Sequence, residues 1–70
     1  MINWYRVVDL EQNVFEDDTY MVGISPYEVA KSYAKSIGLN ENNVKRVYDS
    51  KGSNVRLVVY GKGKSFLYSI

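Results

Sequence analysis

Residues 24–39 read ISPYEVAKSYAKSIGL and hold a complete set of signals for a helix with defined ends. Ser25 is the expected N-cap, the proline after it suits the first helical position, and Glu28 completes a Ser-x-x-Glu capping box. Gly38 follows the last turn, where a left-handed residue and then an apolar one form a Schellman-type stop. The sequence therefore predicts one α-helix over residues 26–37.

The helix has one apolar stripe, which predicts that it packs on a flat surface. Its members are Val29, Ala30, Tyr33, Ala34 and Ile37. The rest of the chain is rich in β-branched and aromatic residues separated by turn residues, which favours strands. We expect these strands at residues 2–10, 19–23, 44–49, 54–60 and 64–70. The prediction is a single α+β domain over residues 1–70, in which one helix covers an antiparallel sheet of four to five strands in the order β-β-α-β-β-β.

Alternation along each strand predicts which side chains face the helix. In residues 54–60 the inward row is expected to be Val55, Leu57 and Val59, and in residues 19–24 it is expected to be Tyr20, Val22 and Ile24. Residues 2–10 are apolar on both rows, which favours an interior strand or a sheet covered on both faces. Residues 50–53 are expected to form a hairpin loop between the third and fourth strands.

The composition excludes many kinds of site. The chain of 70 residues contains neither cysteine nor histidine, so it has no thiol nucleophile, no imidazole base and no zinc-finger ligands. We predict no catalytic residue, no metal site, no cofactor and no small-molecule substrate. The sequence also shows neither a signal peptide nor an apolar run long enough to span a bilayer, so we expect a cytoplasmic protein without membrane contact.

The charges divide unequally along the chain. Residues 1–43 contain three basic and seven acidic side chains, whereas residues 44–70 contain six basic ones and one acidic one. Basic side chains interleaved with aromatic rings on a sheet suit nucleic acid, because cations bind phosphates and rings stack on bases. The first hypothesis is therefore a non-enzymatic binding module that contacts nucleic acid or a nucleoprotein through its C-terminal strands, with the candidate residues Lys45, Arg46, Tyr48, Lys51, Arg56, Tyr60, Lys62 and Lys64.

The alternative hypothesis is a protein-interaction domain. A chain of this size is near the lower limit for independent folding. Its seven tyrosines suit an interface, because a tyrosine ring can be buried while its hydroxyl stays in contact with water. It is expected either to form a homodimer through apolar sheet surface or edge strands, or to act as a small phage or mobile-element type of inhibitor that docks on a larger nucleic-acid enzyme. The candidate residues for a partner are Tyr5, Glu11, Glu16, Asp17 and Asp18.

The passage from Tyr20 to Ala34 runs from a short strand directly into a capped helix. It resembles the strand-then-helix step of several small β-β-α-β proteins, some ribosomal and some phage-encoded. The resemblance implies only this local order of elements, and it carries over no functional residue.

Overall fold

The computed structural model describes residues 2–12, 19–48, 51 and 54–70. These residues form a five-stranded antiparallel sheet, one α-helix and one short 3-10 helix, as the α+β prediction requires. The elements are β1 (Asn3–Asp9), β2 (Thr19–Gly23), α1 (Pro26–Ser36), η1 (Glu41–Asn43), β3 (Lys45–Val47), β4 (Leu57–Gly61) and β5 (Lys64–Ser69). Within the described part of the chain, no helix has the length and apolar character needed to cross a membrane.

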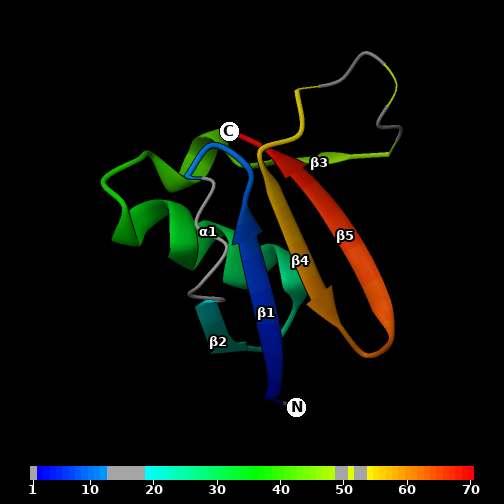
Figure 1. The fold of residues 1–70 in the computed structure, drawn as a ribbon. Helices are drawn as coiled ribbons and strands as arrows, with labels where there is room; N and C mark the ends of the chain where they lie inside the picture. The colour runs from blue at the N-terminus through cyan, green and yellow to red at the C-terminus, as the bar shows by residue number, and fades with distance from the viewer. Residues whose placement is uncertain (1, 13–18, 49–50, 52–53) are drawn as a thin grey trace.

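The strands are ordered β2-β1-β4-β5-β3, and α1 packs across β1, β2 and β4. In Figure 1 the helix lies behind β1. Of the two alternatives for the first strand, an interior strand or a sheet covered on both faces, the interior position is confirmed, because β1 lies between β2 and β4.

The predicted hairpin between β3 and β4 is wrong, because β3 pairs with β5 instead. The three residues 57–59 are all buried, so β4 needs neighbours on both sides and takes an interior position between β1 and β5. Lys45 and Arg46 are exposed, which suits β3 to the edge of the sheet. Most of the expected hairpin loop, at residues 50, 52 and 53, lies outside the described residues.

The ends of α1 follow the capping signals of the sequence. Ser25 Oγ accepts a hydrogen bond from the backbone N–H of Glu28 at 3.2 Å. At the other end the backbone N–H of Gly38 donates to Lys35 O, and that of Leu39 donates to Ala34 O at 2.9 Å. This pair of bonds is the Schellman motif, so both predicted helix ends are confirmed.

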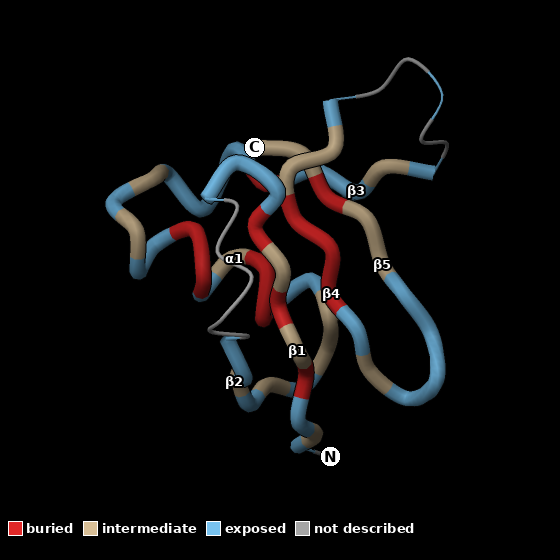
Figure 2. Tube along the Cα trace, viewed as in Figure 1, coloured by how far each residue is buried: buried red, intermediate tan, exposed pale blue. Residues whose placement is uncertain are grey.

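The core lies between α1 and one face of the sheet. Figure 2 shows the buried residues concentrated in β1, β4 and α1. The cluster consists of Tyr5, Val7, Val29, Ala30, Tyr33, Ala34, Val44, Leu57, Val59 and Tyr68, and Ile37 and Ile70 pack against it while remaining partly exposed. The predicted apolar stripe of the helix and the inward direction of Leu57 and Val59 are thereby confirmed.

The inward row predicted for β2 is wrong. Tyr20, Val22 and Ile24 are 61%, 46% and 65% exposed, and the opposite row faces α1. Gly23 explains this orientation, because a Cβ atom at that position would lie 2.6 Å from Cγ2 of Val29. The helix approaches the strand most closely where no side chain intervenes, so the row that contains Gly23 faces the helix and Tyr20 and Val22 face away from it.

Candidate functional site

The side of the sheet opposite α1 is called the open face here. Strand register places on it every residue that alternates with the inward rows. These residues are Trp4, Arg6, Val8, Tyr20, Val22, Lys45, Val47, Val58, Tyr60, Ser65, Leu67 and Ser69. None of these strand positions holds a carboxylate, while three of them hold large aromatic rings.

The three rings lie close together around one cation. Arg6 pairs with Tyr20 on one side and with Tyr60 on the other, and Trp4 is two residues along β1. Adjacent strands are about 4.8 Å apart, so Tyr20 and Tyr60 are separated by roughly 10 Å across the sheet. Trp4 is 70% and Tyr60 40% exposed. These four residues, Trp4, Arg6, Tyr20 and Tyr60, form what we call the aromatic platform.

A cation–π contact orients one ring of the platform. The guanidinium carbon of Arg6 lies 4.7 Å from the ring centroid of Tyr60. Beside this ring, at the β4–β5 turn, is an open hollow of about 440 Å³ lined by Tyr60, Gly61, Gly63, Lys64 and Ser65. The described part of the chain places no carboxylate within ion-pair distance of Lys62 or Lys64. Positive charge is thus available to a ligand beside an exposed ring.

The structure does not gather the predicted nucleic-acid residues in one place. Lys64 begins β5 and Lys45 pairs with Ser69 at its end, so the two lysines are separated by roughly 17 Å along the strand. Arg46 pairs with buried Tyr68 and so lies on the α1 side, where its guanidinium carbon is 4.9 Å from the ring centroid of Tyr48. Lys51 is exposed in the segment between β3 and β4.

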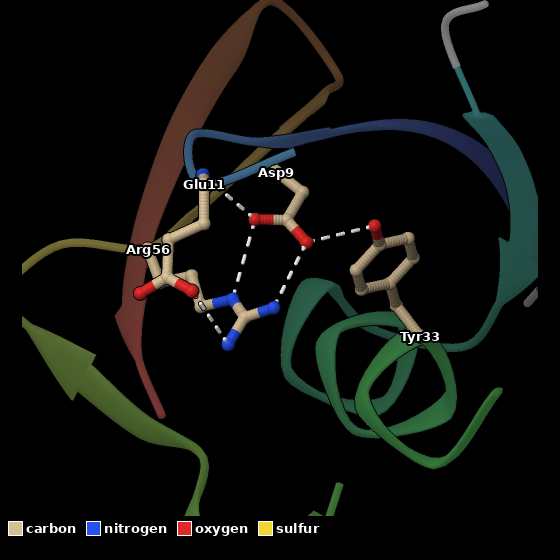
Figure 3. Close-up of polar contacts among 4 residues, drawn as sticks. All are labelled: Asp9, Glu11, Tyr33 and Arg56. Carbon is tan, nitrogen blue, oxygen red and sulfur yellow. Dashed lines mark hydrogen bonds and ion pairs between the residues drawn. The ribbon is translucent and has the colours of Figure 1, made fainter. Parts of the chain in front are cut away.

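Arg56, also predicted to contact nucleic acid, instead lies in a polar cluster at the end of β1 (Figure 3). Its Nε and Nη2 donate to the two carboxylate oxygens of Asp9 at 3.2 and 3.3 Å, and its Nη1 lies 3.1 Å from Glu11. The hydroxyl of Tyr33 donates to Asp9 from α1 at 2.9 Å. The cluster therefore joins β1, α1 and the segment before β4, and Arg56 has a structural role.

The same cluster shifts two pKa values. Burial alone would raise the pKa of Asp9, but hydrogen bonds from Arg56, the Glu11 backbone and Tyr33 outweigh burial and hold it below its ordinary value of 3.8. Burial, together with the hydrogen bond to Asp9, raises the pKa of Tyr33 to about 12. The folded state therefore favours a charged Asp9 beside a neutral Tyr33.

These pKa shifts predict the pH limits of stability. A lowered carboxyl pKa stabilises the fold above about pH 4, and this stabilisation is lost as the pH falls through the lower folded value. A raised tyrosine pKa stabilises the fold below about pH 10, and this stabilisation is lost as the pH rises toward 12. Thermal unfolding followed by circular dichroism should show a plateau between these limits. If the thermal unfolding midpoint of Asp9→Asn fell with decreasing pH as steeply as that of the wild type, the acid limit of stability would not arise from Asp9.

The residues predicted for a protein partner are also dispersed. Tyr5 is only 1% exposed and lies in the core, so it does not face a partner in this structure. Glu11 is paired with Arg56. Glu16, Asp17 and Asp18 lie outside the described residues. Within the described residues there is no group of three or more acidic side chains arranged to hold a metal ion.

Sequence reasoning missed three members of the aromatic platform: Trp4, Arg6 and Tyr20. Alternation put Tyr20 in the inward row with Val22 and Ile24, the row that leads directly into the helix. Gly23 was the available signal, since a glycine in a strand often marks a close approach to another element. Side chains alternate between the two faces of a strand, so Tyr20, three residues before Gly23, points away from the helix. The β1–β2 register then places Trp4 and Arg6 on the same face as Tyr20.

Comparison of the chain with protein-family models, with curated proteins and with solved structures found no match.

Proposed function

We propose that this protein is a non-enzymatic binding module that holds single-stranded nucleic acid on the open face of its sheet. The observation that carries the proposal is the aromatic platform itself, with three exposed rings on a sheet face whose strand positions hold no carboxylate. Bases would stack on Trp4, Tyr20 and Tyr60. Phosphates would approach Lys62 at the β4–β5 turn, whereas Lys64 pairs with Gly61 and so lies in the row that faces α1.

The physical basis is the affinity of rings for bases. Stacking of a base on an aromatic side chain contributes about 1–3 kcal/mol, and every base has a face that can stack. A duplex keeps its bases stacked on one another, so a broad sheet face with exposed rings suits single strands better. We therefore expect weaker binding to a duplex than to a single strand of the same sequence.

Trp4 allows a direct test, because it is the one tryptophan of the chain and belongs to the platform. Labelled single-stranded DNA and RNA and the matching duplex would be titrated with protein at two salt concentrations. Anisotropy of the label gives the affinity, and quenching of Trp4 fluorescence gives the location. Salt-sensitive binding that quenches Trp4 supports the proposal, because phosphate contacts release counterions on binding. Absence of binding at low salt, or binding that leaves Trp4 fluorescence unchanged, would refute it.

Tyr60→Ala should weaken binding of a single strand by about tenfold or more, since one stacked base is lost. Tyr48→Ala is the matched control, because Tyr48 is 85% exposed and its ring contacts the guanidinium of Arg46, which pairs with buried Tyr68 on the α1 side of the sheet. Equal losses of affinity in the two variants would show that the ligand does not bind on the open face.

A further inference from the structure

The two edge strands of the sheet differ in charge, and charge on an edge strand opposes its pairing with a strand of another molecule. The edge strand β3 carries Lys45 and Arg46. The other edge strand, β2, reads Thr-Tyr-Met-Val-Gly and contains neither a charge nor a proline. In the described part of the chain no strand pairs with the outer side of β2. One edge is thus protected against pairing and the other is not.

Apolar side chains gather beside the unprotected edge. Trp4 pairs with Val22, and Ile2 and Ile24 stand next to the paired ends of β1 and β2, where Asn3 pairs with Gly23. Trp4, Tyr20 and Val22 lie on the open face, and all five side chains are exposed, with Ile2 at 68% and Val22 at 46%. Five side chains of this size present on the order of 500 Å² of apolar surface. Pairing through the edge of β2 would bury only the rim of this apolar surface, which is less than the about 800 Å² per partner of a standard stable interface, so we expect a weak dimer.

We propose that a second copy of this chain pairs with the outer edge of β2. An antiparallel pair with its twofold axis at Met21 sets Met21 opposite itself and Thr19 opposite Gly23 of the other copy. It also sets each Tyr20 opposite Val22 of the other copy. An aromatic ring beside a β-branched side chain is a favourable cross-strand pair, and this arrangement makes two of them. The strand is self-complementary in this register, which a twofold interface requires.

Edge pairing leaves the open face uncovered. The twofold axis is perpendicular to the sheet, so the open faces of both copies lie on the same side. Trp4 and Tyr20 of the two copies would then approach one another across the axis, and the aromatic platform would become continuous over both chains. The dimer therefore does not depend on nucleic-acid binding, although it would lengthen the surface available to a strand.

Sedimentation equilibrium over roughly 5 to 500 µM, without nucleic acid, tests the association. We expect the mass to rise from monomer toward dimer with concentration. The double variant Tyr20→Lys/Val22→Lys sets like charges opposite each other and should weaken the dimer by at least about tenfold. The control variant Ser32→Lys/Asn42→Lys adds the same charge at exposed positions away from β2 and should dimerise like the wild type. A wild-type mass that stays monomeric throughout would overturn the proposal.

Cross-linking tests the register, and the absence of native cysteine makes it selective. In the proposed pair, residue 20 of one copy faces residue 22 of the other within reach of a disulfide, whereas two residues 20 are diagonal and beyond it. A mixture of the Tyr20→Cys and Val22→Cys proteins should therefore oxidise to a mixed dimer faster than either protein alone. Equal rates in the mixture and in the separate proteins would show that the copies do not pair through β2 in this register.

Discussion

Asp9→Ala is expected to lower the free energy of unfolding by about 3 kcal/mol, because it leaves two partners of a buried carboxylate unsatisfied. The Asp9 side chain is only 3% exposed, and it accepts hydrogen bonds from the guanidinium of Arg56 and the hydroxyl of Tyr33. Without the carboxylate, the Tyr33 hydroxyl remains in the core with no acceptor. Arg56 keeps only its pair with Glu11, which is 67% exposed and therefore screened by water.

Urea unfolding at neutral pH measures this loss. Glu28→Gln is a suitable control, because it removes a carboxylate from an exposed ion pair with Lys31 on the surface of α1. We expect that variant to unfold close to the wild-type midpoint. If Asp9→Ala were no less stable than Glu28→Gln, the buried cluster would not link β1, α1 and the segment before β4 as its geometry indicates.

Gly61→Ala is expected to cost about 3 kcal/mol through a steric clash in the core. A Cβ atom at residue 61 would lie 2.2 Å from Cδ1 of Tyr5 and 2.5 Å from Cε1. Tyr5 is buried between β4 and Met21 of β2, so its ring has little space into which to move. The strand or the ring must therefore shift, and neighbouring contacts are lost.

A double-mutant cycle identifies the cause of this loss. Tyr5→Leu removes the ring atoms that the new Cβ atom would meet, so Gly61→Ala should cost less in that background than in the wild type. Urea unfolding of the four proteins gives the coupling. An equal cost of Gly61→Ala in both backgrounds would mean that the destabilisation arises elsewhere than at the Tyr5 ring.

Gly61→Ala and Tyr5→Leu also bear on the proposed surface, because neither residue is a member of the aromatic platform, although Gly61 lines the hollow beside Tyr60. Residue 61 follows Tyr60 directly, and Tyr5 separates Trp4 from Arg6 along β1. The inward side chains of β1 and β4 pack in the core and so fix the position of the two strands. The outward side chains of the same strands include Trp4, Arg6 and Tyr60 of the aromatic platform. If these variants lose affinity for nucleic acid, the cause is expected to be unfolding of the protein. Tyr60→Ala, by contrast, is expected to lose affinity while it remains folded.

The extents of the elements were largely predictable from the sequence. The N-cap at Ser25 and the stop at Gly38 act within one helical turn, so the signals and the structure they specify lie in the same few residues. The strands β1, β2 and β5 also lie close to their predicted ranges, because runs of β-branched and aromatic residues between turns favour extended backbone wherever they pack. Such local preferences determined the helix, the approximate strands and the α+β class.

Strand order, the orientation of β2 and the partner of Arg56 were decided only in the tertiary structure. Arg56 meets Asp9 across 47 residues of sequence, and Tyr33 meets it across 24. Contacts of this kind depend on which strands become neighbours, and one residue of register turns every side chain to the other face. Close approach of Val29 to Gly23 set that register for β2 and turned Tyr20 outward. The aromatic platform therefore exists because α1 packs closely against Gly23. Secondary-structure propensities depend on neighbouring residues in the sequence and do not specify such a tertiary contact.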